Sequence, residues 1–484
     1  MKLYSFPENY DKKSGDYTVT AKATQIIGVY YCNVSAYPFN RVWPGKQRSA
    51  SQTEKMAYVM LGSDGEITLD IECTKSFEQA VVRPLSKKIV AHKIRDKKIG
   101  VTFPGPGQYC IQFDDMHNVL MVFINPEKEF DIKKDDVNVI YYGPGVHYVD
   151  EKIVLRDNQT LFIDQGAVVY GAVEAIDKKN VSVVGYGILD NSRMFRYNEV
   201  TAHPEWDEAT RKRVGKPIYF DRCENAVVDG ITIVDSSEWT IRTDGCCNVL
   251  VNNVKVIGNW RYNTDGCDFC NSTNCIISDS FLRNFDDGIV VKGRVYDRNL
   301  PVQNILAENC VVWTDWSKSL EVGVETCAPY LSDITFRNCD IIQGGAIIMD
   351  ITQADMGDVT NVRFEDIRVE YTGCEQIGVI QESDEHEYPV SGEKYMPQLF
   401  AVQSGSLWYS NDAATGNIQD IYFKNIRVYT PDGTIPQGSK IRSYNETGHI
   451  NGVYFEDIYV NDQKCSLDML GVKIGDRVSG VQEQ

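Results

Sequence analysis

The chain has 484 residues, a length that predicts either two or more domains or one long repetitive domain. Apolar residues make up 43% and charged residues 24% of it, which are ordinary values for a globular protein and exclude extensive disorder. The formal net charge of −19 disfavours binding to nucleic acid and to anionic membrane surfaces, so neither is an expected partner.

The amino-terminal segment gives no sign of export. No apolar run follows Met1, and no stretch of the chain reaches 18 consecutive apolar residues. These observations predict a cytoplasmic protein without a membrane span.

The first 135 residues contain short segments of alternating polarity, such as residues 57–61 and 66–71, separated by Gly, Asp and Lys turns. This pattern predicts a β-sandwich domain over residues 1–135. The charged stretch 127–136 is typical of a linker, and a second domain is expected over residues 136–484.

Beyond residue 140 a short unit recurs, in which Asn or Asp precedes a run of alternating apolar residues. The copies begin at Asn180, Asn225, Asn248, Asn274, Asn304, Asp333, Asn361, Asp420 and Asn451. Most lie roughly 23 to 31 residues apart, a period typical of solenoids. The period-two alternation indicates strands, no helical segments separate them, and the Leu framework of leucine-rich repeats is missing. The sequence therefore predicts an all-β fold, a right-handed parallel β-helix preceded by the sandwich.

Several of the 14 cysteines directly follow an asparagine of the repeat. Examples are the pairs Asn274-Cys275, Asn309-Cys310 and Asn338-Cys339. This recurrence indicates one small buried position that Cys fills as a compact hydrophobe, so free thiols are expected rather than disulfides.

Two segments interrupt the repeat. Residues 191–216 are polar and contain Trp206, whereas residues 381–416 are acidic and contain His386, Tyr395, Trp408 and Tyr409. Long insertions in a solenoid usually form walls of a binding face, and we expect the same of both segments.

Aspartates gather in the middle of the repeat region. Asp244, Asp265 and Asp286 follow one another at intervals of 21 residues, and Asp287 comes directly after. Spacing close to one coil predicts equivalent positions on successive coils, about 5 Å apart per step. Crowded carboxylates raise one another's pKa, and glycosidic cleavage needs one protonated and one ionised carboxyl. The alternative, that Asp-Gly pairs only mark turns, stays open for Asp244 and is favoured for Asp268.

The segment 263–268, Asn-Thr-Asp-Gly-Cys-Asp, followed by Asp286-Asp287 resembles the signature of glycoside hydrolase family 28, the polygalacturonases. Segments 183–190 and 239–249 resemble two further landmarks of that family. The resemblance implies that Asp286 is the general acid and that Asp265 and Asp287 hold and activate the nucleophilic water.

Segments 143–148, 158–162 and 166–172 are similar to the start of the β-helix in the dextranase-type family 49 of the same clan. Members of that family also carry a β-sandwich ahead of the β-helix. Because both families invert the anomeric configuration, the resemblance implies an inverting enzyme.

The chain departs from the polygalacturonases at two positions. Lys318 stands where the family has a histidine, and residues 347–350 replace an Arg-Ile-Lys triplet that clamps the galacturonate carboxylate. Lys440-Ile441-Arg442 resembles the triplet reversed, but lies several coils later. A uronate would then face Asp350 without a partner, at a cost on the order of kcal/mol. We therefore expect a neutral or weakly charged oligosaccharide.

Candidate substrate contacts complete the predicted site. Trp260 and Trp316 lie near the acids in sequence and are expected to stack on sugar rings, whereas Trp239 and Trp313 are expected in the core. The remaining substrate-binding candidates are Asp244, Lys318 and Glu321. For Lys318 the alternatives are substrate contact, lowering the pKa of a neighbouring Asp, and a surface turn.

No metal or other cofactor is expected. The six histidines show no metal spacing, and Cys267-x-x-Cys270 has no second pair. The sequence leaves a homo-oligomer open.

These features predict an inverting glycosidase that acts on small oligosaccharides, with exo action because long insertions flank the cleft. The alternatives are a polygalacturonase, a β-helix polysaccharide lyase with a Lys or Arg base and calcium, and a non-catalytic glycan-binding β-helix such as a surface adhesin.

Overall fold

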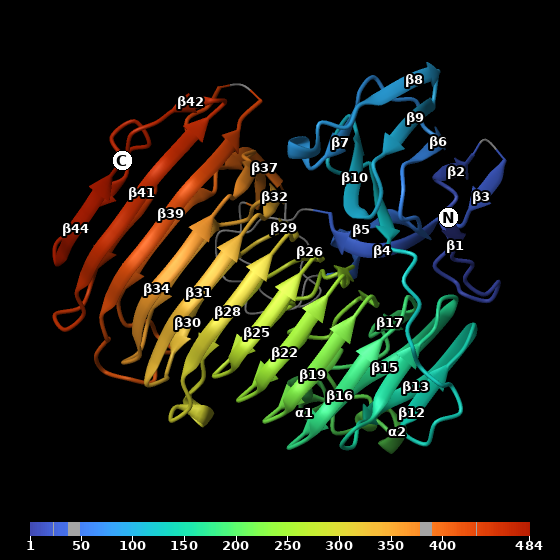
Figure 1. The fold of residues 1–484 in the computed structure, drawn as a ribbon, viewed down its shortest axis with the longest axis horizontal. Helices are drawn as coiled ribbons and strands as arrows, with labels where there is room; N and C mark the ends of the chain where they lie inside the picture. Colours follow the sequence, from blue (N-terminus) through green and yellow to red (C-terminus); the bar gives the residue numbers. More distant parts are fainter. Residues whose placement is uncertain (23, 37–48, 378–389, 432) are drawn as a thin grey trace.

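The computed structural model describes residues 1–22, 24–36, 49–377, 390–431 and 433–484. The fold is almost entirely β and consists of a small amino-terminal β-sandwich beside a long β-helix (Figure 1), which confirms the predicted fold class. The described helices are α1 (Tyr197–Ala202), α2 (Glu208–Lys212) and the 3₁₀ turns η1 (Ala50–Gln52), η2 (Leu85–Lys87) and η3 (Val295–Asp297). No helix in the described ranges is both long and apolar enough to cross a bilayer.

Two sheets form the amino-terminal sandwich, because their apolar faces share one core. The first sheet contains β1 (Lys2–Leu3), β4 (Tyr30–Ser35), β5 (Thr53–Gly62), β7 (Ala80–Arg83), β10 (Gly107–Phe113) and β11 (Val119–Asn125). The second contains β2 (Tyr17–Ala21), β3 (Gln25–Ile27), β6 (Ile67–Cys73), β8 (Ala91–Arg95) and β9 (Lys98–Phe103). The predicted boundary at residue 135 falls in the connection that follows β11.

The β-helix winds through three stacks of parallel strands. The first stack is β12 (Val139–Tyr142), β14 (Thr160–Ile163), β16 (Lys179–Val184), β19 (Glu224–Asp229), β22 (Cys247–Asn252), β25 (Thr273–Ser278), β28 (Val302–Glu308), β31 (Tyr330–Arg337), β34 (Asp358–Glu365), β39 (Ile418–Tyr429), β41 (Ile450–Val460) and β44 (Val478–Glu483). The second is β13 (Gly145–Val154), β15 (Ala167–Ile176), β18 (Ile218–Asp221), β21 (Ile241–Asp244), β24 (Cys267–Cys270), β27 (Ile289–Gly293), β30 (Lys318–Thr326), β33 (Ile347–Gln353), β38 (Gln398–Ser404), β40 (Lys440–Ser443) and β43 (Lys473–Ile474). The third is β17 (Ile188–Asp190), β20 (Thr232–Val234), β23 (Lys255–Ile257), β26 (Phe281–Asn284), β29 (Val311–Thr314), β32 (Asp340–Gln343) and β35 (Arg368–Glu370). Outside the stacks, β42 (Gln463–Lys464) pairs with β41, and β36 (Cys374–Ile377) pairs with β37 (Val390–Tyr395).

The interior of the β-helix is one continuous apolar core, to which each strand contributes alternate residues. In β24 the inward residues are Cys267 and Phe269. The residue between them, Asp268, therefore belongs to the outer face of the second stack, and this face carries the polar residues described below.

An asparagine ladder explains the sequence repeat. Six residues share a backbone φ between 55° and 60°, a left-handed conformation that Asn tolerates better than most residues. They are Asn158, Asn180, Asn225, Asn248, Asn274 and Asn304. Each side-chain amide donates to the side-chain oxygen of the preceding member, over 2.7 to 3.2 Å. The repeated residue thus satisfies a turn and joins adjacent coils.

We expect Asn248→Ala to lower the free energy of unfolding by about 2 kcal/mol, because alanine loses both ladder hydrogen bonds and is strained at positive φ. Asn248→Gly should lose about 1 kcal/mol, since glycine accepts this φ and loses only the hydrogen bonds. Chemical denaturation measures both, and equal stability of all three proteins would show that the ladder does not contribute.

The cysteines of the repeat are small buried residues. Cys275, Cys310 and Cys339 are fully buried, and each follows an asparagine with positive φ. All cysteines with described side chains are free thiols, which confirms the prediction for that part of the chain.

The sandwich packs directly against the third stack, since one apolar cluster contains residues of both, among them Tyr58, Phe123, Phe281 and Trp313. Arg283 on β26 is 1% exposed and forms an ion pair with Asp315, which is itself buried. The sandwich therefore supports the β-helix at its third stack, whereas the polar face belongs to the second stack.

Candidate active site

A cavity of about 540 Å³ opens on the outer face of the second stack. Its described lining combines carboxylates, ammonium groups and aromatic rings: Trp239, Asn263, Asp265, Asp286, Asp287, Lys292, Trp316, Ser317, Lys318, Val324, Glu325, Ala346, Tyr395, Trp408 and Tyr409. Such a mixture suits a polar ligand with apolar faces, as sugars are.

The three predicted catalytic aspartates meet in this cavity. Asp265 precedes β24, and Asp286 and Asp287 lie in the turn between β26 and β27. The adjacent coils are joined by the backbone N–H of Gly266, which donates to the carbonyl of Asp287 over 2.9 Å. The turn itself is held by the Asn284 amide, which donates to the carbonyl of Asp287 over 2.7 Å. Stacking thus brings two distant stretches of chain to one wall.

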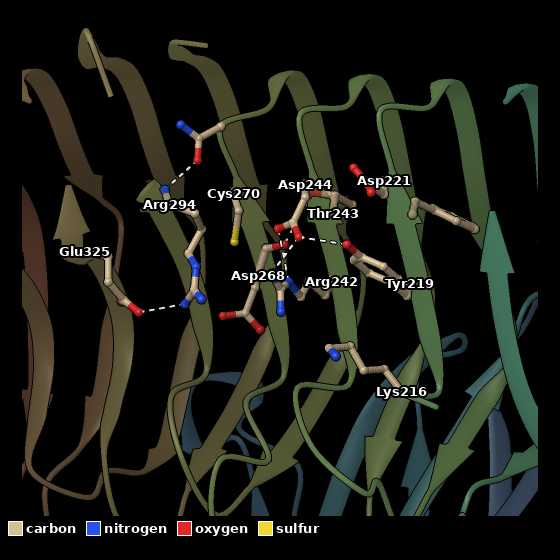
Figure 2. A network of polar contacts seen from close by, with 12 residues as sticks. Lys216, Tyr219, Asp221, Arg242, Thr243, Asp244, Asp268, Cys270, Arg294 and Glu325 are labelled. Carbon is tan, nitrogen blue, oxygen red and sulfur yellow. Dashed lines mark hydrogen bonds and ion pairs between the residues drawn. The ribbon is translucent and has the colours of Figure 1, made fainter. Parts of the chain in front are cut away.

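The predicted alignment of Asp244 with Asp265 is wrong. Asp244 pairs in register with Cys270, because this coil is longer than the 21 residues that the aspartate spacing suggested. Arg242 binds the Asp244 carboxylate through Nε at 3.0 Å and through Nη2 at 2.5 Å, and the hydroxyl of Tyr219 donates to it over 3.1 Å (Figure 2). Asp244 is not part of the described lining of the cavity, and its contact with substrate stays a prediction.

Asp286 favours the protonated form. Burial, followed by the charges of Asp265 and Asp287, raises the pKa of Asp286 well above its ordinary value. Its Oδ2 accepts one hydrogen bond, from the backbone N–H of Asn263 at 3.2 Å. A buried carboxyl that keeps its proton near neutral pH can serve as a general acid.

The neighbouring Asp287 favours the ionised form. Burial raises its pKa, but the ammonium groups of Lys318 and Lys292 lower it by more, and the pKa of Asp287 lies below its ordinary value. Its Oδ1 also accepts hydrogen bonds from the hydroxyl of Ser317 and from the backbone N–H of Lys318. The pKa values of these two adjacent aspartates are therefore shifted in opposite directions.

Asp265 lies between these extremes. Burial raises the pKa of Asp265 to about 6, although the Lys292 ammonium, 3.0 Å from its Oδ2, acts in the opposite direction. Asp268 lies beside it on β24, where burial and the Asp265 charge raise the pKa of Asp268 well above its ordinary value. The sequence had favoured a turn role for Asp268, but the structure places it in a strand beside the acids.

Lys318 is a cavity residue and not a surface lysine. Its Nζ lies 2.9 Å from Glu321 and 3.7 Å from Asp287. The ammonium lowers the pKa of Asp287, which was one of the three alternatives for Lys318. Glu321 is fully buried behind it and does not line the cavity. The Glu321 carboxylate binds Lys318, and its contact with a sugar stays a prediction.

The aromatic lining differs from the prediction at two positions. Trp316 lines the cavity as expected, but Trp260 does not, because its indole N–H donates to Asp235 over 3.1 Å outside the cavity. Trp239, expected in the core, lines the cavity, whereas Trp313 is 2% exposed in the apolar cluster as predicted.

Comparison with known proteins agrees with this geometry. The model of glycosyl hydrolases family 28 matches residues 150–389, a segment that contains all three aspartates. Residues 150–389 of this chain are therefore similar to the glycosyl hydrolases of family 28.

Curated relatives match only part of this chain. A "Probable rhamnogalacturonase B" of Aspergillus terreus is 32% identical over 146 residues, which cover 30% of this chain and 26% of the relative. A "Probable rhamnogalacturonase A" of Aspergillus oryzae is 26% identical over 147 residues, which cover 30% and 29%. The matched segments thus span between a quarter and a third of these relatives.

A solved structure resembles the whole fold. Dex49A from Penicillium minioluteum superposes with a TM-score of 0.68 at 14% identity, covering 100% of this chain and 96% of that one. This likeness extends over the sandwich as well as the β-helix and concerns the fold.

The cavity holds two ammonium groups, and carboxylates bind both. Lys292 contacts Asp265 and Asp287, and Lys318 contacts Glu321 and Asp287. On the next coil Asp350 is fully buried and accepts a hydrogen bond from Thr352. The nearest part of the reversed triplet, Lys440, lies two strands beyond Asp350 in the stack. Within the described lining, each cation therefore already has an anionic partner.

Both insertions relate to the cavity, in different ways. Tyr395, Trp408 and Tyr409 of the second insertion line it, as predicted for a wall, while His386 lies outside the described residues. The first insertion contacts a loop of the cavity and not the cavity itself. Its Arg196 guanidinium donates hydrogen bonds to the carbonyl of Tyr262 and to the side chain of Asn263. It thereby fixes the loop that carries Asn263 into the cavity.

Sequence reasoning missed Lys292 and Trp239 as cavity residues. A signal for Lys292 was present, because Ile289 and Val291 alternate with it as inward residues of one strand and leave the lysine on the outer face. Its contact with Asp265 could not be predicted, because the two residues lie 27 positions apart in the sequence.

We expect Trp239→Ala to lower kcat/KM about tenfold through loss of an aromatic wall of the cavity. Trp260→Ala is the matched control, since that ring lies outside the cavity, and should change kcat/KM much less. Steady-state kinetics at a temperature where both variants are folded decides, and an equal loss for both would contradict the assignment.

Proposed function

We propose that this chain is a glycoside hydrolase that cleaves its substrate in a single inverting displacement, with Asp286 as general acid and Asp287, assisted by Asp265, as the base that activates water. The observation that carries the proposal is the opposite protonation preference of two adjacent aspartates in one cavity. Paired carboxyl groups with separated pKa values are what acid–base cleavage of a glycosidic bond requires.

In the proposed reaction, Asp286 gives its proton to the leaving glycosidic oxygen while the bond to the anomeric carbon breaks. A water molecule held by Asp265 and Asp287 attacks that carbon from the opposite face, and Asp287 takes its proton. The ammonium groups of Lys292 and Lys318 keep Asp287 ionised before the attack. The products are the shortened sugar with inverted anomeric configuration and the freed alcohol.

We propose a neutral or weakly charged sugar at the point of cleavage. The two cavity ammonium groups are bound by carboxylates, so a uronate there would compete with Asp265, Asp287 and Glu321 for them. The aromatic lining offers faces for the C–H surfaces of a sugar ring.

A pectin-type substrate is the second candidate, favoured by the segment shared with relatives named rhamnogalacturonases. A polysaccharide backbone in which neutral and acidic sugars alternate would agree with these relatives and with the carboxylate-bound ammonium groups. The neutral sugar would then lie beside residues 347–350, where the polygalacturonases have the basic triplet. Exo action, a small oligosaccharide as substrate and a cytoplasmic location stay predictions.

A panel of oligosaccharides tests the proposal: α-linked glucose oligomers, rhamnogalacturonan oligomers and digalacturonate, followed by NMR. Hydrolysis of a neutral-sugar linkage with the inverted anomer as first product is the expected result. Efficient cleavage of digalacturonate would overturn the neutral-sugar proposal, and a product with retained configuration would overturn inversion. Unsaturated products that absorb ultraviolet light would indicate a lyase.

A further inference from the structure

Lys292 is a buried ammonium group that joins the acids of the cavity. Its Nζ lies 3.0 Å from Asp265 Oδ2, 3.3 Å from Asp268 Oδ1 and 3.7 Å from Asp287 Oδ2, and its side chain is only 4% exposed. A buried cation is costly unless carboxylates and hydrogen bonds surround it. Here the partners come from two successive coils.

An aromatic ring covers a further side of this ammonium. Trp239 lies with its ring centroid 4.0 Å from Lys292 Nζ. Arg242 and Arg294 also lie over that ring, at 4.8 and 4.9 Å, and each is bound to a carboxylate of its own, Asp244 or Glu325 (Figure 2). Trp239 therefore separates the ammonium from solvent at the edge of the cavity.

The other titratable groups that face Lys292 come from the strands on both sides of it. One is Cys270, which lies in register with Lys292 on β24. The others are Glu325, whose charge raises the pKa of Lys292, and Asp286 and Glu321, on whose pKa values the Lys292 charge has a lowering influence. These carboxyl groups, with those of Asp265, Asp268 and Asp287, outnumber the cations Lys292, Lys318 and Arg294, so we expect some of them to keep their protons.

We propose that Lys292 is a positioning residue that holds Asp265 and Asp287 together as an ionised pair around the nucleophilic water. The inference rests on the proposed roles of the three aspartates. Lys318 cannot replace it, because among the described ion pairs Lys318 reaches Asp287 and Glu321 while Lys292 alone bridges Asp287 to Asp265.

The physical reason is the repulsion between two carboxylates in a buried site. Each would raise the pKa of the other, and one would take a proton or turn away, so that the water would lose a partner. An ammonium between them removes that repulsion in the ground state. Asp286 is not among the ion pairs of Lys292, which is consistent with its retention of a proton.

Lys292→Met tests this role, since methionine keeps most of the volume and removes the charge. In the unmodified enzyme kcat/KM should fall as the pH decreases through about 6, where Asp265 takes up a proton. In Lys292→Met this acidic limb should move upward by about one pH unit or more, with kcat at neutral pH lowered about 100-fold and KM changed less. In Lys292→Arg, which keeps the charge, the acidic limb should lie close to its position in the unmodified enzyme.

Lys255→Met is the matched control. Lys255 is as deeply buried as Lys292 but contacts Asn125 and Asn253 between the sandwich and the β-helix. Its loss should lower the melting temperature without moving the acidic limb. If Lys292→Met behaves like this control, with an unmoved limb, Lys292 has a structural role and the proposal fails.

A second measurement needs no substrate. Infrared difference spectra across pH should show a carboxyl band that titrates near pH 6, disappears in Asp265→Asn and moves to higher pH in Lys292→Met. A band that stays in place in Lys292→Met would overturn the proposal. Loss of the catalytic assignment would appear separately, as full activity of Asp286→Asn on the oligosaccharides of the panel, with the infrared result unchanged.

Discussion

Asp286→Asn is expected to lower kcat about 1,000-fold on oligosaccharides, because the amide cannot give a proton to the departing sugar oxygen. The substitution keeps the size of the side chain, and its backbone neighbours need not move. The hydrogen bond from the Asn263 backbone can still be accepted by the amide oxygen. Steady-state rates on the oligosaccharide that the unmodified enzyme cleaves best measure the loss.

A substrate with a better leaving group distinguishes the general acid from the general base. On a 2,4-dinitrophenyl glycoside of the same sugar the leaving oxygen needs little protonation, so Asp286→Asn should retain a large part of its rate. Asp287→Asn should lose a similar factor on both substrates, because activation of water is required in either case. The roles of the two aspartates would be exchanged if Asp287→Asn, and not Asp286→Asn, recovered on the activated substrate.

The repeat was predictable because its causes are local. A left-handed turn residue and a strand of alternating polarity each leave a mark within a few residues of sequence, as at Asn248 and the strand that follows it. The adjacent pair Asp286-Asp287 was predictable for the same reason, since two carboxylates in one tight turn are costly and indicate chemistry.

Register between coils was not predictable in the same way. Coil length varies with loops of any size on the outside, so the equal spacing of Asp244, Asp265 and Asp286 did not mean equal positions. The contact of Lys292 with Asp265 depends on that register, and so does the exclusion of Trp260 from the cavity. Such contacts are decided by the packing of whole coils and by insertions, which no short segment encodes.

The sandwich–helix contact gives the second large effect. We expect Arg283→Met to lower the free energy of unfolding by about 3–5 kcal/mol, because it removes the cation that compensates the buried Asp315 carboxylate. The guanidinium also lies 4.0 Å from the Trp313 ring centroid and contacts the sulfur of Met56, so the loss includes contacts with the sandwich. Calorimetry and chemical denaturation measure the change.

The double variant Arg283→Met, Asp315→Leu separates charge from packing. If the uncompensated carboxylate causes most of the loss, the double variant should recover a large part of it, since apolar groups of similar volume can replace a buried ion pair. No recovery would assign the loss to packing around Trp313 and Met56 instead. A single unfolding transition in all three proteins would further show that the sandwich and the β-helix unfold together, as their shared apolar cluster predicts. A separate early transition in Arg283→Met would instead mean that the ion pair couples two otherwise independent units.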